Sequence, residues 1–209
     1  MVTVLLVIVG GGMVTTFLMG QTAYFSTDAS IQVQQEARRA FDAMNRELRE
    51  AGPTTGATLI STTGANQLNF QIARGYNTEP GVPPTGCQSP LPTICWGSEQ
   101  ATGQWVHYAV VGPPGNQRQL IRCTNTSQGT PITMFTPGTC RVLANNIMTD
   151  PTVPVFTLDS LASPKVVKIQ LLLQYKHSEL PGGAQTFGTK ITPGTNTSPL
   201  ISQVRLRNS

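Results

Sequence analysis

Residues 33–51 read VQQEARRAFDAMNRELREA, and this stretch decides the fold of the chain. Its apolar residues recur three or four positions apart, which places them on one stripe of an α-helix. Gly52 and Pro53 end the predicted helix, because Gly suits the position after the last turn and Pro cannot continue the hydrogen-bond pattern. The stripe predicts that the helix docks on a sheet through Val33, Ala37, Phe41, Met44 and Leu48.

The same helix carries a second, charged face. Charges alternate in sign at i,i+4 spacing along Arg38, Asp42, Arg46 and Glu50, which stabilises a helix by a few tenths of a kcal/mol per pair. Two interpretations of this face stay open. It is either a solvated surface or a surface that meets neighbouring subunits.

The preceding residues 2–25, VTVLLVIVGGGMVTTFLMGQTAYF, carry no charge, and Asp28 is the first side chain that is charged at neutral pH. About twenty apolar residues cross the hydrocarbon core of a bilayer as a helix, so residues 1–27 are predicted to form a transmembrane segment. A cleaved secretory signal would need a basic start, and no Lys or Arg precedes Arg38. A buried core helix is the third alternative. The residues expected to anchor this segment are Val4, Leu5, Leu6, Ile8, Val9, Met13, Phe17 and Leu18.

Gly10, Gly11 and Gly12 interrupt this segment, and each costs about 1 kcal/mol relative to Ala in a helix. They indicate either close packing between helices or a place where the helix melts and extends. No stronger breaker separates residues 2–51, which predicts one helix of about 75 Å.

The composition divides the chain into three parts. They are the apolar half of the predicted helix at 1–27, its amphipathic half at 28–52 and a β-rich part at 53–209. Only 11% of the 209 residues are charged, whereas 39% are hydrophobic, which argues against a disordered chain. Residues 28–50 hold nine of the charges, and the formal net charge is only +4. The remaining residues show no basic stripe of the kind that indicates nucleic-acid binding.

After Pro53 the apolar period changes from 3.6 to 2, as in half-buried strands. Strands are predicted at residues 67–72, 105–111, 119–123, 142–148, 153–158, 165–175 and 200–206, with Gly- and Pro-rich turns between them. Many strands and one amphipathic helix predict the α+β class, with the helix packed on an antiparallel sheet.

The four cysteines all lie in this β-rich part, and their even number suits an oxidising compartment. Their spacing favours the disulfides Cys87–Cys95 and Cys123–Cys140, each stabilising by roughly 2–4 kcal/mol. A zinc site is the rival interpretation. It is disfavoured because C-x2-C spacing is absent.

The sequence contains no recognisable catalytic motif, metal-binding motif or phosphate-binding glycine loop, so no catalytic residue, metal or cofactor is predicted. His107 lies between apolar residues in a strand-like run and is interpreted as structural. Trp96 and Trp105 are interpreted as packing residues. Two N-glycosylation sequons, at Asn125 and Asn196, are short enough to arise by chance.

These features together resemble the type IV pilin superfamily, and within it the W-type minor pilins and the J-type pseudopilins of type II secretion. The opening residues 1–9, MVTVLLVIV, look like the run that follows the superfamily's processed N-terminal motif. Residues 35–52 resemble a charged amphipathic segment that ends in L-R-x-A-G, and residues 203–208, QVRLRN, resemble the V-x-L-R-N ending. The leader and the usual glutamate are absent, with Leu5 at the glutamate's position, so Met1 is interpreted as an internal methionine.

The resemblance implies a pilin-like fold and a non-enzymatic structural subunit of a pilus-like or pseudopilus filament. The anchoring residues would then form the filament core, and Gly10–Gly12 would mark where the helix melts on assembly. Implied partners are copies of the same chain, other pilins, the inner-membrane assembly machinery and, before assembly, the bilayer. The implied location is the inner membrane and then a periplasmic or extracellular filament. The alternative function is a membrane-anchored adhesion or DNA-uptake module, with nucleic acid as a weakly supported partner.

Overall fold

The computed structural model describes residues 2–51, 60–77, 87, 93–112, 118–150, 152–160, 165–177, 185–188 and 199–206. Helix α1 spans Val2–Glu50, and the described strands follow it along the chain. They are β1 Ile60–Thr62, β2 Gln67–Phe70, β3 Ile72–Asn77, β4 Thr93–Gly97, β5 Trp105–Val111, β6 Arg118–Asn125, β7 Cys140–Met148, β8 Phe156–Leu158, β9 Val166–His177, β10 Gln185–Gly188 and β11 Leu200–Arg205.

The strands form an antiparallel sheet with the order β1-β2-β5-β6-β7-β9-β10, while β3 and β4 pair separately. Strand β9 is shared between two parts of this sheet. Its first half pairs with β11 and β8, and its second half pairs with β7 and β10. The amides of Val155 and Phe156 also bond to the carbonyl of Ala65, which brings the start of β8 to the β1–β2 turn. The sheet therefore curls until it nearly closes into a barrel.

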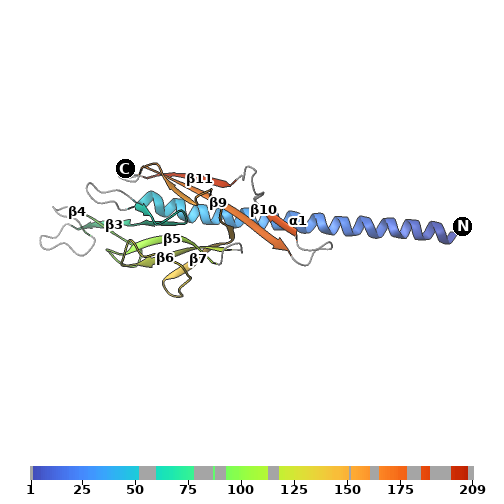
Figure 1. The fold of residues 1–209 in the computed structure, drawn as a ribbon, viewed down its shortest axis with the longest axis horizontal. Coiled ribbons are helices and arrows are strands. Elements are labelled where there is room, and N and C mark those ends of the chain that lie inside the picture. The colour runs from blue at the N-terminus through green and yellow to red at the C-terminus, as the bar shows by residue number, and fades with distance from the viewer. Residues whose placement is uncertain are drawn as a thin grey trace.

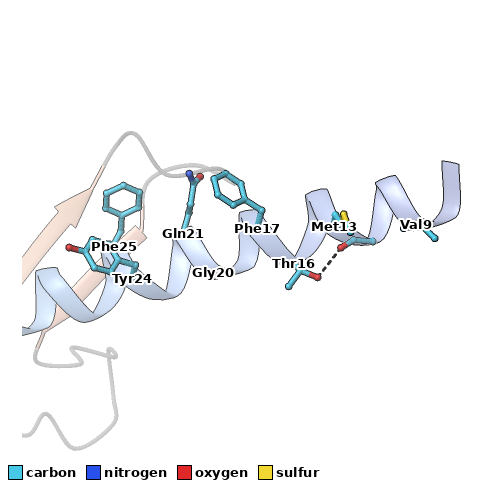
Figure 2. A pocket seen from close by; sticks show the side chains of 9 residues that line it. Val9, Met13, Thr16, Phe17, Gly20, Gln21, Tyr24 and Phe25 are labelled. Carbon is cyan, nitrogen blue, oxygen red and sulfur yellow. Dashed lines mark hydrogen bonds between the residues drawn. The ribbon is translucent and has the colours of Figure 1, made fainter. Parts of the chain in front are cut away.

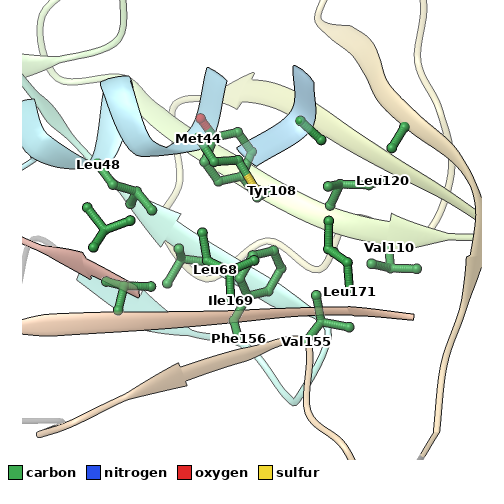
Figure 3. Close-up of a cluster of buried hydrophobic side chains, with 14 of the residues drawn as sticks. Met44, Leu48, Leu68, Tyr108, Val110, Leu120, Val155, Phe156, Ile169 and Leu171 are labelled. Carbon is green, nitrogen blue, oxygen red and sulfur yellow. The ribbon is translucent and has the colours of Figure 1, made fainter. Parts of the chain in front are cut away.

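The second half of α1 lies on the concave side of this curled sheet (Figure 1), and the first half extends beyond the strands. Val33, Ala37, Met44 and Leu48 are buried there. They share one core with Leu68, Tyr108, Leu120, Ile169 and Leu171 from the strands (Figure 3). Phe41 packs against this core but is only partly buried.

A second, smaller core lies on the opposite face of β5 and β6. It contains Ala109, Val111, Ile121 and Cys123, and the loop residue Ile132 packs against it. Alternate residues of β5 and β6 thus face α1 on one side and the β6–β7 loop, residues 126–139, on the other. Burial on both faces explains the long apolar runs of these strands.

The predicted α+β, pilin-like fold class is wrong, although α1 does pack on the sheet. Strand accounts for 45% of the structure against 29% for helix, and the sheet is barrel-like. Period-2 patterning located most of the strands but carries no information on how the sheet closes. Closure depends on β8 and on hydrogen bonds between backbone groups that are distant in sequence.

The predicted transmembrane segment is also corrected. Within the described residues, no helix combines the length and the apolar character that a membrane crossing requires. From Val9 onward, the apolar character of the segment is lowered by four glycines and by the polar residues Thr15, Thr16 and Gln21. The division of the chain at residues 27 and 52 stays a prediction, and Gly52 and Pro53 lie outside the described residues.

Candidate functional site

The first half of α1 exposes large apolar side chains around its circumference. Exposed fractions reach 70% for Met13, 65% for Phe17 and 74% for Met19. We define the apolar helix face by these residues together with Val9, Val14, Leu18, Tyr24 and Phe25, all of which are exposed. A soluble domain rarely exposes so many large apolar side chains together unless another molecule covers them.

The apolar helix face includes a shallow groove of about 990 Å³. Figure 2 shows its lining side chains along α1. They are Val9, Gly12, Met13, Thr16, Phe17, Gly20, Gln21, Tyr24 and Phe25. Gly12, Thr16 and Gly20 follow one another four residues apart, so the small residues line up along the groove.

The hydroxyl groups near this groove bond to the helix itself. Thr16 donates to the carbonyl of Gly12 at 2.8 Å, and Thr15 donates to the carbonyls of Gly11 and Gly12. Such back-bonding satisfies the hydroxyl donors within the helix. A partner at this surface would therefore meet mainly apolar groups.

The chain's own packing does not require the glycines of this half. A Cβ atom added at Gly10, Gly11, Gly12 or Gly20 would meet nothing within 4 Å. Because glycine in an exposed helix costs about 1 kcal/mol relative to Ala, these residues are unfavourable in the single subunit. Either close approach of a partner or melting of the helix would give them a use, and both interpretations made from the sequence stay open.

Half of the residues predicted for anchoring and the filament core can be placed. Val9, Met13, Phe17 and Leu18 belong to the apolar helix face. The side chains of Val4, Leu5, Leu6 and Ile8 lie outside the described residues. Further along α1, the alternating charges Arg38, Asp42, Arg46 and Glu50 are all exposed in the single subunit.

Sequence reasoning missed a polar cluster that fixes α1 to the sheet, which we call the Glu47 junction. The carboxylate of Glu47 accepts hydrogen bonds from Arg122 Nε, Arg141 Nη2 and the Tyr108 hydroxyl, each at 2.7 Å. Arg122 also binds both carboxylate oxygens of Glu99. The junction therefore joins α1 to β5, β6, β7 and the segment after β4.

Burial and charge shift the pKa values at the junction. Burial alone would lower the pKa of Arg122, but the hydrogen bonds that it donates to Glu99 and Glu47 outweigh burial and hold that pKa above its usual value. For Glu99, burial acts to raise the pKa, but Arg122 brings it below the usual value. Burial and the charge of Glu47 raise the pKa of Tyr108. Arg122, Glu99 and Tyr108 therefore keep their ordinary charge states at neutral pH.

A second acidic residue of α1 extends the attachment. Glu36 accepts hydrogen bonds from the backbone N–H and the side-chain amide of Asn145 in β7, at 2.7 and 2.8 Å. Glu36 and Glu47 are about three helical turns apart, so they hold β7 at two heights along α1. Charge patterning placed both residues in the amphipathic half but did not identify their partners.

His107 is fully buried in β5, where its Nδ1 lies 2.8 Å from Asn69 Oδ1. Because an amide oxygen only accepts hydrogen bonds, Nδ1 carries the proton and donates it to Asn69, whose oxygen also accepts a hydrogen bond from Gln67. Burial lowers the pKa of His107 to about 4. These contacts agree with the structural role predicted for this residue.

Both predicted disulfides, Cys87–Cys95 and Cys123–Cys140, are confirmed. The first ties β4 to Cys87, and the second joins β6 to the start of β7 beneath the β6–β7 loop. Trp96 is buried in β4 and Trp105 is half-buried in β5, in keeping with packing roles. Within the described part of the chain, no group of three or more His, Cys, Asp or Glu side chains lies close enough to hold a metal ion.

Comparisons of the chain with protein-family models, curated proteins and solved structures find no match.

Proposed function

We propose that this protein is a non-catalytic structural subunit of a pilus-like or pseudopilus filament, and that it assembles through the apolar helix face of α1. The observation that carries the proposal is the exposure of that face on the half of α1 that extends beyond the strands (Figure 1). Its partners would be other copies of the chain or related subunits. Covering these side chains would stabilise the filament by about 25 cal/mol per Å² of apolar surface removed from water.

The attachment of α1 to the sheet supports the same function. A subunit that assembles through one end of a helix must transmit load from that helix to the rest of the chain. The Glu47 junction and the Glu36–Asn145 contact fasten α1 to β5, β6 and β7 through side chains, in addition to the apolar core. The β-rich part of the chain, which we call the head, would therefore move with α1 as one body.

The two disulfides favour an exported subunit, because disulfides persist in oxidising compartments. We accordingly propose a periplasmic or extracellular filament. The described β-rich head would face the solvent around a core made of helices.

Substitution of an apolar residue of α1 tests the proposal. Leu18→Asp places a charge on the apolar helix face and should reduce the fibre mass recovered by ultracentrifugation, with fibres absent in electron micrographs. Gln35→Asp is the matched control, since it adds the same charge at an exposed position of the same helix. Unimpaired fibres from Leu18→Asp, or no fibres from the unmodified chain, would contradict the proposal.

A further inference from the structure

The β6–β7 loop presents two large apolar side chains to the solvent. Met134 is 69% exposed and Phe135 is 39% exposed, and no charged residue occurs between Thr124 and Thr139. Met and aromatic residues are enriched in protein interfaces, whereas charged residues are depleted at their centres. The composition of the loop thus suits an apolar partner.

The loop is held on both sides of these residues. Before them, the Gln67 side chain bonds to the carbonyl of Thr130 and to the amide of Ile132, both at 2.9 Å. Ile132 also packs against the smaller core. After them, the Cys140 amide bonds to the carbonyl of Thr136, and Cys140 is linked to Cys123. Because the loop is already ordered, binding would cost little conformational entropy.

The groove on α1 has matching chemistry. It is uncharged at neutral pH, because Asp28 is the first charged side chain of the sequence, and it is lined by Met and aromatic side chains beside Gly12 and Gly20. Within one copy the two surfaces cannot meet. Figure 1 places the β6–β7 loop on the head, whereas the groove lies on the part of α1 that extends away from it.

We infer that Met134 and Phe135 of one copy dock into the α1 groove of the next copy in the filament. This inference rests on the proposed function and adds a second contact between neighbouring subunits of the filament. The two surfaces differ, so the contact is heterologous, and repeated heterologous contacts produce open fibres. Met13 lies in the groove, whereas Leu18 does not line it and lies about 140° around the helix from Met13, so the surface around Leu18 stays available for other helices.

A charge-swap experiment tests this contact. The full chain is prepared as Met134→Asp, as Met13→Lys and with both substitutions together. Either single substitution leaves an unpaired charge at every contact and should reduce the sedimented fibre mass at least about tenfold. An equimolar mixture of the two single variants should restore fibres. In the mixture, the acidic loop of one variant meets the basic groove of the other, and the unmodified loop meets the unmodified groove. The double variant should assemble without a partner.

Met134→Leu and Met13→Leu are the matched controls and should assemble like the unmodified chain. Thermal unfolding of the head, measured for each variant, identifies any loss of folding. Full assembly of either charged single variant would overturn the docking contact. So would a mixture of folded variants, or a folded double variant, that fails to assemble. In all these cases the unmodified chain forms fibres, whereas its failure to do so would reject the proposed function itself.

Discussion

The Glu47 carboxylate lies 2.7 Å from Arg122 Nε, which joins the last turns of α1 to β6 across 75 residues of sequence. The Arg122 side chain is only 4% exposed and that of Glu47 is 13% exposed. Removing one partner of a buried ion pair leaves the other charge poorly compensated. The pair therefore matters more for how α1 is positioned than an exposed ion pair would.

Glu47→Gln should destabilise the head by about 2–4 kcal/mol in urea unfolding, because Arg122 retains Glu99 but loses its charged partner on α1. Glu50→Gln is the control, since Glu50 lies on the same helix but is exposed. The expected cost of the control is within about 0.5 kcal/mol. Equal effects of the two substitutions would show that the junction adds nothing beyond an ordinary surface charge.

Two substitutions that shorten side chains of α1 should differ in their cost to the unfolding free energy, according to how deeply each side chain is buried. Met44→Ala is expected to cost about 2–5 kcal/mol, because Met44 is fully buried in the main core. Phe41→Ala should cost less, although Phe is larger, because its ring is only partly buried. Unfolding free energies of both variants check the order, and a larger loss at Phe41 would mean that its ring carries more of the packing than its exposure indicates.

Acid should destabilise the head through His107. Its pKa is about 4 in the folded chain and 6.5 when unperturbed, so the unfolded chain binds more protons between these values. Stability is therefore lost as pH falls from about 6.5 towards 4, by at most about 1.4 kcal/mol per pH unit.

Urea unfolding at pH 7 and pH 5 measures this loss, and His107→Gln should flatten the pH dependence. The range above pH 5 is informative because the carboxylates with lowered pKa values, Glu99, Asp150 and Asp159, lose their stabilising contribution only at lower pH. An unchanged slope in the variant would assign the effect to another group.

Gly11→Ala should stabilise α1 in the single subunit by about 1 kcal/mol, since the added methyl group meets open space. Hydrogen exchange of amides near residue 11 should slow about fivefold, while the unfolding of the head stays unchanged. If the helix melts at Gly10–Gly12 on assembly, the same substitution should also slow fibre growth. Faster growth would favour close helix packing instead.

Sequence patterns predicted the parts of this fold that depend on local periodicity. The spacing of Val33, Ala37, Met44 and Leu48 identified the buried stripe of α1, and alternation over residues 67–72 identified β2. Strands β1, β3, β4 and β10 were missed because they are short or lie beside Pro- and Gly-rich stretches, and the strand predicted at 67–72 reaches only the first residue of β3. Length and composition distinguished the first half of α1, with its apolar helix face, from the rest of the chain. The transmembrane segment that they predicted there was wrong.

The polar contacts were beyond sequence reasoning for a different reason. Glu47 has the same local pattern as the exposed acids around it, and only the folded sheet brings Arg122, Arg141 and Tyr108 to it. The buried position of Gln67 depends likewise on the path of the β6–β7 loop. Periodicity reports which face of an element is apolar, and it does not report which distant side chain that face will meet.

The sharing of β9 makes the order of synthesis matter. Val166–Leu171 has β8 as one neighbour, but its other neighbour, β11, is made after more than twenty further residues. Until Leu200–Arg205 has been made, that edge of β9 offers unpaired backbone groups to any other extended chain. A growing or truncated chain is thus exposed to strand pairing between molecules, and the last strand protects the protein from aggregation as well as completing its sheet.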